Sequence, residues 1–283
     1  MFPILSKRAL NEAATVYEFR IRAPLAAAHC RAGQFVIIQL DEQGERIPLT
    51  VACCDAAEGS VTVMVQAAGF TTRLLCGMEA GDELFAVAGP LGRATELKNG
   101  GNIAVVGGGV GCAIAWPVAR AFRDAGCHVD LIAGFRSRDI VMLEEEMRRD
   151  SSELFLCTDD GSYGEKCFGN AKLEALIREG RRYDEVFIVG PPIMMKFTSL
   201  TTRPYGIYTV ASLCPVMIDG SGMCGGCRVT VGGETRFACV DGPDFDAHQV
   251  DWDELIARCG FYADEEAEAR EHNCRMTGGV RHG

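Results

Sequence analysis

The sequence predicts three parts in order: an antiparallel β-barrel, an α/β domain with a mostly parallel sheet, and a small C-terminal segment rich in glycine and cysteine. Residues 1–97 contain short apolar strands separated by turns. In residues 98–202, strands alternate with glycine turns and helical runs, an order that gives a parallel sheet with helices on both faces. Residues 203–283 concentrate glycine and cysteine before an acidic helical run.

Composition and charge exclude several classes of function. The 283 residues carry 39 acidic and 28 basic side chains, a formal net charge of −11. Such a surface repels phosphate backbones and anionic lipids, so we expect no nucleic-acid partner. No window offers the roughly 20 apolar residues of a membrane span, and the start MFPILSKRAL lacks the basic-then-apolar order of a signal peptide. We therefore expect a cytoplasmic protein that does not enter a membrane.

The chain contains 14 cysteines, which should be free thiols in a reducing compartment. Eight lie singly or in one adjacent pair among small or apolar residues, where a buried thiol simply packs. These eight are Cys30, Cys53, Cys54, Cys76, Cys112, Cys127, Cys157 and Cys167. The cysteines near the C-terminus are different, because their spacing is that of ligands.

The barrel is predicted from strands at 16–23, 34–40, 60–66 and 82–89, which carry alternating or β-branched apolar residues at regular spacing. The α/β domain is predicted from apolar strands that begin near residues 102, 128, 153 and 185. Helical runs lie between them at 142–149 and 171–180. A further helical run is expected at 250–273, followed by a disordered tail at 277–283.

A glycine turn marks the first strand of the α/β domain. The strand at 103–108 enters a turn that leads into a helix, so backbone N–H groups and the positive helix end face any anion there. The turn contains Gly107, Gly108, Gly109 and Gly111. It departs from the full G-x-G-x-x-G fingerprint, because Ala113 takes the third small position. We expect a nucleotide at this turn, although glycines also occur there for packing alone.

Two other turns follow strands of the same sheet. Gly190 and Pro191 form a rigid turn at the carboxyl edge, where ligands of such sheets usually bind. Asp160 follows another strand and either lines the same crevice or belongs to a solvated acidic turn. Arg136 and Arg138 follow a third strand, where a 2′-phosphate would be recognised, so the residues leave NAD and NADP open.

A set of potential metal ligands lies between residues 219 and 239. Asp219, Cys224, Cys227 and Cys239 follow the plant-type ferredoxin spacing C-x4-C-x2-C with a distant fourth ligand, except that aspartate replaces the first cysteine. The surrounding glycines allow the loop to wrap closely and to direct N–H groups at sulfur. The pattern favours a 2Fe-2S cluster. Tetrahedral zinc is the alternative, and Cys214 is the other candidate for the first ligand.

Taken together, residues 1–275 resemble the ferredoxin–NADP reductase superfamily, and within it the small (alpha) subunits of NADH-dependent ferredoxin:NADP oxidoreductases, which are bifurcating transhydrogenases. The related electron-transfer subunits of dihydroorotate dehydrogenase B are a less similar alternative, because they have four cysteines where this chain has Asp219 and three cysteines. Many relatives also carry a cysteine before the Gly190–Pro191 turn, and Val189 occupies that position here. A third alternative, of another class, is a non-catalytic regulatory module that contains zinc.

The resemblance implies a set of flavin contacts in the barrel. An R-x-Y/P-S/T turn is represented by Arg46, Pro48, Leu49 and Thr50, with the arginine on the flavin pyrophosphate. A second phosphate segment is represented by Gly69, Thr71 and Thr72, and the turn that closes the barrel by Gly89 and Pro90. No side chain is expected to act as a catalytic acid or base.

The resemblance also implies the cofactors, the reaction and a partner. We expect FAD, a 2Fe-2S cluster and NAD(H), with NADP(H) as the alternative nucleotide. Hydride would pass between nicotinamide and flavin N5, and single electrons between flavin and cluster. The implied partner is a larger FAD and 4Fe-4S subunit, similar to the small chain of glutamate synthase, in a heterodimer.

Overall fold

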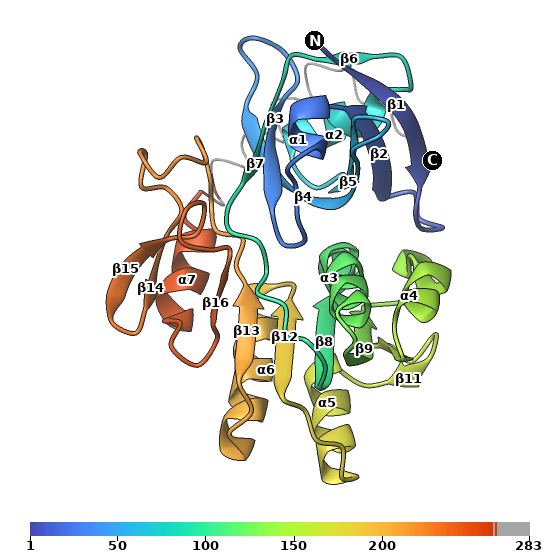
Figure 1. The fold of residues 1–283 in the computed structure, drawn as a ribbon, viewed down its shortest axis with the longest axis vertical. Helices are drawn as coiled ribbons and strands as arrows, with labels where there is room; N and C mark the ends of the chain where they lie inside the picture. The colour runs from blue at the N-terminus through green and yellow to red at the C-terminus, as the bar shows by residue number, and fades with distance from the viewer. Residues whose placement is uncertain (263, 265–283) are drawn as a thin grey trace.

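The N-terminal part of the fold is a seven-stranded antiparallel sheet that curls on itself (Figure 1). Its strand order is β6-β1-β2-β5-β4-β3-β7. Only Phe85 separates β6 from β7, so the two edge strands are nearly continuous and the sheet is almost a closed barrel. The strands are β1 (Phe2–Ala9), β2 (Val16–Arg22), β3 (Phe35–Gln39), β4 (Arg46–Asp55), β5 (Ser60–Gln66), β6 (Glu83–Leu84) and β7 (Ala86–Leu91).

The barrel interior is filled by apolar side chains that alternate along the strands, including the fully buried Phe19, Ile21, Ile38 and Val63. Two short helices belong to this part, α1 (Pro24–Ala27) and α2 (Phe70–Gly77). The computed structural model describes residues 1–262 and 264, and the expected tail at 277–283 lies outside the described residues.

The second part is a mostly parallel seven-stranded sheet of order β11-β10-β9-β8-β12-β13-β16, in which only β16 runs antiparallel to its neighbour. Its strands are β8 (Asn102–Gly108), β9 (His128–Phe135), β10 (Glu153–Thr158), β11 (Glu165–Lys166), β12 (Glu185–Val189), β13 (Thr209–Ser212) and β16 (Asp244–Asp246). Four helices accompany them, α3 (Cys112–Asp124), α4 (Glu144–Asp150), α5 (Gly169–Arg178) and α6 (Pro192–Thr202). Single 3-10 turns are η1 (Gly109–Gly111), η2 (Arg138–Ile140) and η3 (Arg203–Tyr205).

Both faces of this sheet are buried, as the continuous apolar strands predict. In β8, Ile103 and Val105 pack into the core beneath α3 and α4. The alternate residues Ala104 and Val106 pack into the opposite core with α5 and α6. The first core also contains Met64 of β5, so α3 joins the sheet to the barrel.

The C-terminal part consists of the loop 213–227, the hairpin of β14 (Arg228–Val231) and β15 (Glu234–Phe237), and α7 (Trp252–Cys259). Within the predicted helical run 250–273, the structure has α7, while residues 263 and 265–273 lie outside the described residues. Strands β13 and β16 come from residues beyond 202. The predicted boundary at residue 202 therefore does not coincide with an edge of the sheet.

A short connector ties the barrel to the segment that leads into β16. After β7, the amide of Arg93 donates a 2.6 Å hydrogen bond to the carbonyl of Gly242. The Thr95 hydroxyl donates a 2.6 Å hydrogen bond to Asp244. In the described part of the chain, no helix is long and apolar enough to cross a membrane.

Candidate functional site

Three parallel strands end at one edge of the sheet, and the candidate site is built there. β8 ends at Gly108, β12 at Val189 and β13 at Ser212. β8 pairs with β9 on one side and with β12, a later strand, on the other. The chain order therefore reverses between β8 and β12, the switch point at which open α/β sheets bind ligands.

Three of the four glycines at the end of β8 and in the turn after it are closely packed. An added Cβ at Gly107 would lie 2.9 Å from Cβ of Ala115, and at Gly111 it would lie 2.6 Å from the Val189 carbonyl. At Gly108 it would lie 2.7 Å from Cε of Met194. Gly109 differs, because its φ is +55° and an added Cβ meets nothing within 4 Å. The open space for a ligand is therefore at Gly109.

Gly190 and Pro191 lie directly beside this turn. Gly107 of β8 pairs with Val189 of β12. Gly108 and Gly190, the residues that follow them, therefore lie side by side. An added Cβ at Gly190 would lie 3.1 Å from the Gly108 amide, which explains why a glycine stands there. The structure thus brings the two predicted nucleotide turns together.

Asp160 is not part of this group. It follows β10, which is separated from β8 by β9. Its Oδ1 accepts hydrogen bonds from the amide and the hydroxyl of Ser162, and these hydrogen bonds lower the pKa of the carboxyl. The amide of Arg138 donates to the Ser162 hydroxyl, so the Asp160 turn lies near the end of β9 rather than at the switch point. Of the two sequence interpretations, the structure favours the exposed acidic turn.

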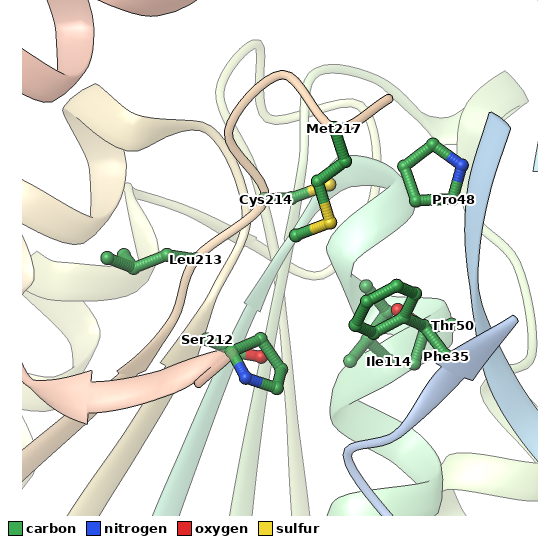
Figure 2. A pocket seen from close by; sticks show the side chains of 9 residues that line it. Phe35, Pro48, Thr50, Ile114, Ser212, Leu213, Cys214 and Met217 are labelled. Atoms are coloured by element: carbon green, nitrogen blue, oxygen red, sulfur yellow. The ribbon is translucent and has the colours of Figure 1, made fainter. Parts of the chain in front are cut away.

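A cleft lies where the barrel, the parallel sheet and the C-terminal loop meet (Figure 2). It encloses about 330 Å³ of empty space, including the part open to solvent. Figure 2 shows barrel side chains on one side and residues of the 212–217 segment on the other. The lining residues are Phe35, Pro48, Thr50, Ile114, Ser212, Leu213, Cys214, Met217 and Pro243.

The predicted flavin segment Arg46–Thr50 is the first half of strand β4 rather than a turn. Because strand residues alternate between faces, Pro48 and Thr50 line the cleft. Leu49 packs against the barrel core instead, so its side chain is not directed at the cleft. Arg46 is exposed at the start of the strand, in register with Gln39.

The second predicted phosphate segment is the start of α2. Gly69 precedes the helix, and its amide donates a 2.9 Å hydrogen bond to the hydroxyl of Thr72. Thr71 is buried and its hydroxyl donates to a carboxylate oxygen of Glu45, the residue before Arg46. The structure therefore connects Thr71 with the Arg46 end of β4. Neither Thr71 nor Thr72 lines the cleft in Figure 2.

Gly89 and Pro90 lie within β7, which pairs with β3. An added Cβ at Gly89, where φ is +153°, would lie 2.8 Å from Cγ1 of Val36. Phe35, the neighbour of Val36, lines the cleft. Gly89 and Pro90 therefore do not line the cleft, but Gly89 packs against the strand that carries Phe35.

The four candidate ligands form two pairs. Cys227 and Cys239 are buried, and their sulfur atoms lie 3.1 Å apart. Asp219 and Cys224 are linked by a 2.9 Å hydrogen bond from the Cys224 amide to Oδ2. Arg228 pairs with Phe237 across the hairpin, which explains how Cys227 and Cys239 meet.

The protonation of these groups differs. The Ser221 and Cys224 amides lower the pKa of the Asp219 carboxyl, so it is ionised at neutral pH. Burial, together with the neighbouring Cys227 thiol, raises the pKa of Cys239 to about 12. Metal binding at Cys239 must therefore displace its proton.

The two pairs match the ligand arrangement of a two-iron centre. A 2Fe-2S cluster takes two protein ligands on each iron, and two separate pairs supply this. Cys214, the other candidate first ligand, lines the cleft in Figure 2.

The sequence interpretation missed six cleft residues, Phe35, Ile114, Ser212, Leu213, Met217 and Pro243. They are ordinary apolar or small residues on different elements, and no local pattern marks them. Only the fold brings them together.

The fold and the cleft define a flavin oxidoreductase of the ferredoxin–NADP reductase type. Phthalate dioxygenase reductase has the same fold, with a TM-score of 0.58 at 16% identity over 84% of this chain and 93% of that one. A solved structure of an NADH-dependent reduced ferredoxin-NADP oxidoreductase, described for flavin-based electron bifurcation, gives a TM-score of 0.90 at 42% identity. It covers 96% of this chain and 97% of that chain.

The chain belongs to the family of dihydroorotate dehydrogenase B electron transfer subunits and their homologues. Residues 215–251 match the iron-sulfur cluster binding domain of dihydroorotate dehydrogenase B. A Thermotoga maritima homolog of the electron transfer subunit is 43% identical over 95% of this chain and 98% of its own length. The Geobacillus thermodenitrificans electron transfer subunit is 31% identical over 87% of this chain and 96% of its own. The predicted fold class and family resemblance are confirmed.

Proposed function

We propose that the chain is an FAD-dependent NAD(P)H oxidoreductase subunit that passes electrons between NAD(H), FAD and a 2Fe-2S cluster. One observation carries the proposal: a single segment lines the cleft with Ser212, Cys214 and Met217 and then supplies Asp219. The flavin site and the cluster site are therefore consecutive in the chain. The flavin supplies hydride chemistry and the cluster supplies one-electron chemistry when both are bound.

In this proposal the flavin ring lies in the cleft, with Pro48 and Thr50 on one wall and the 212–217 segment on the other. Thr50 offers a hydroxyl for the ring, and Phe35 offers an apolar surface. Arg46, on the same face of β4, is the proposed contact of the flavin pyrophosphate, because a guanidinium forms bidentate contacts with phosphate. The N-terminus of α2 at Gly69 is a second anion contact.

The nicotinamide nucleotide fits the switch point between β8 and β12. Gly109 leaves space for a ligand beside the start of α3. Ile114 in the first turns of that helix lines the flavin cleft, so a nucleotide at Gly109 approaches the flavin from the sheet side. NAD(H) is the proposed nucleotide, and NADP(H) remains the alternative.

The proposed cluster ligands are Asp219 and Cys224 on one iron and Cys227 and Cys239 on the other. Cys224 is exposed while Cys227 and Cys239 are buried, so one side of the cluster faces solvent. An apolar surface borders it, with Ile218 53%, Met223 89% and Val240 44% exposed. An exposed apolar surface next to an electron-transfer centre fits a protein partner.

The proposed partner is a larger subunit that carries FAD and 4Fe-4S clusters and resembles the small chain of glutamate synthase, in a heterodimer. The 0.90 TM-score with the ferredoxin-NADP oxidoreductase structure supports this choice over a dihydroorotate dehydrogenase partner. Metal-bound thiolates and many free thiols fit a reducing compartment such as the cytoplasm.

The test is reconstitution of the purified chain with FAD, iron and sulfide under anaerobic conditions. We expect the flavin absorbance to bleach on titration with NADH or NADPH, and the reduced protein to give a paramagnetic 2Fe-2S signal. A Cys227→Ser, Cys239→Ser double variant should keep flavin bleaching and lose the paramagnetic signal. A flavin that neither nucleotide bleaches contradicts the proposal, as does zinc found in place of iron.

A further inference from the structure

A buried carboxylate lies directly behind one wall of the cleft. Asp244 begins strand β16 and pairs with Ser212 of β13. Ser212 and Pro243, the residue before Asp244, both line the cleft. Side chains of directly paired residues in antiparallel strands lie on the same face. Ser212 is thus the polar side chain that adjoins both the cleft and Asp244.

One oxygen of this carboxylate lacks a partner. Thr95 donates a 2.6 Å hydrogen bond to Oδ2. Oδ1 is fully buried and has no hydrogen-bond partner among the described residues. An ionised carboxylate left in this state is unfavourable, so the site favours binding of a proton on Oδ1.

The surrounding charges also favour the protonated form of Asp244. Glu185 of β12 is buried and adds repulsion to Asp244. Lys98 lies 3.0 Å from Glu185 and forms its ion pair there rather than with Asp244. Tyr208 precedes β13 and is neutral at physiological pH, because burial raises its pKa above the ordinary value. Burial raises the pKa of Asp244 to about 6, against smaller lowering effects of the Thr95 and Ser212 hydroxyls.

We propose that Asp244 is a redox-linked proton acceptor of the cleft: its carboxylate binds one proton from solvent when electrons enter the cleft and releases it when they leave. This inference rests on the proposed function, which places a flavin there. The only bond formed on the residue is O–H, and the electrons come from the nicotinamide nucleotide and leave towards the cluster. Added negative charge near a buried carboxylate favours its protonated form, and proton binding in turn stabilises the added electrons.

The experiment measures the flavin midpoint potential of the FAD-loaded protein from mildly acidic to mildly alkaline pH. In the unmodified chain, we expect one extra proton per two-electron reduction over part of this range. This adds about 30 mV of slope per pH unit. Asp244→Asn should lose the extra slope. The matched control is Asp246→Asn on the same strand, whose carboxylate accepts a hydrogen bond from Gln249; this control should keep the extra slope.

Two further measurements keep the test decisive. Infrared difference spectra of reduced minus oxidised protein should contain a protonated-carboxyl band that Asp244→Asn removes. Thr95→Val removes the donor to Oδ2, so the pH range of the extra slope should move upward, and this variant carries the test if Asp244→Asn does not fold. Equal slopes in the unmodified chain and in Asp244→Asn, or an unmoved range in Thr95→Val, overturn the inference. A chain that binds no FAD instead refutes the proposed function.

Discussion

The amide nitrogen of Cys224 donates a hydrogen bond of 2.9 Å to Oδ2 of Asp219, and the Ser221 amide donates one of 2.8 Å to Oδ1. Both carboxylate oxygens therefore have fixed donors, and each has a second lone pair for a metal. A thiolate donates more electron density to iron than a carboxylate. We expect Asp219→Cys to lower the midpoint potential of the cluster, measured by a redox titration of the paramagnetic signal.

The control for Asp219→Cys is Asp241→Asn. Asp241 also accepts a backbone hydrogen bond, from Phe237, in the same loop region, and we expect no comparable change in potential. Cys214→Ser should keep the cluster signal, because Cys214 lines the cleft. Loss of the signal in Cys214→Ser would instead identify Cys214 as the fourth ligand.

The buried sulfur pair predicts a strong effect of either cysteine. Cys227→Ser or Cys239→Ser should prevent stable cluster assembly, since each removes a thiolate from the pair that lies 3.1 Å apart. Iron and sulfide content per chain measures the loss. Cys259→Ser, at an exposed cysteine at the end of α7, is the matched substitution and should retain full iron content.

The glycines after β8 predict two different outcomes. Gly111→Ala places a methyl 2.6 Å from the Val189 carbonyl, so we expect it to destabilise the fold by about 1–3 kcal/mol through forced backbone movement. Gly109→Ala meets no neighbour but keeps a positive φ, which costs about 1 kcal/mol. Denaturant unfolding separates the two. Only Gly109→Ala should weaken nucleotide binding in protein that remains folded, and equal stability of the two variants would contradict this assignment.

Arg46 predicts a specific loss of flavin affinity. Arg46→Gln removes a charged donor, worth about 1.5–3 kcal/mol when it bonds to an anion, so the dissociation constant for FAD should rise roughly tenfold or more. Fluorescence titration with FAD measures this change. Arg73→Gln, at an exposed arginine of α2, should leave the affinity nearly unaltered, and equal losses in both variants would indicate only a general charge effect.

Asp244 predicts a pH-dependent stability even without cofactors. Its pKa rises from 3.8 to about 6 on folding, so between these values the folded chain binds more protons than the unfolded chain. The contribution of Asp244 is thus fully present below about pH 4 and is lost as pH rises through about 6. The free energy of unfolding of Asp244→Asn, compared with that of the unmodified chain, should therefore rise by about 3 kcal/mol from acidic to alkaline pH. Urea unfolding of the apoprotein at both pH values tests this, and a constant difference would contradict it.

Local sequence patterns predicted much of the architecture. The apolar run of β8, followed by its glycines, is visible because strand periodicity and turn chemistry are both local. The ligand spacing from Asp219 to Cys239 could be recognised for the same reason, because all four residues lie in one short stretch of chain. The hairpin closed by the Arg228–Phe237 pair brings its ends together. Arg46–Thr50 was predicted as a turn because the family motif it resembles was interpreted as a turn. In the structure this segment pairs with β3 and is a strand.

The contacts that build the cleft could not be predicted in this way. Thr95 and Asp244 are separated by 149 positions, and Phe35 faces Ser212 across the cleft only because the barrel lies on the carboxyl edge of the sheet. Such contacts depend on packing between parts, for which a single sequence contains no periodic signal. The same holds for Cys214, because the sequence marks it as a candidate metal ligand and gives no sign that it lines the cleft.

The bonds from Arg93 to Gly242 and from Thr95 to Asp244 join the segment after β7 to the start of β16, beside the cleft. Opening the cleft there would break both hydrogen bonds, so the two bonds hold Pro243, a residue that lines the cleft, at a fixed separation from the barrel.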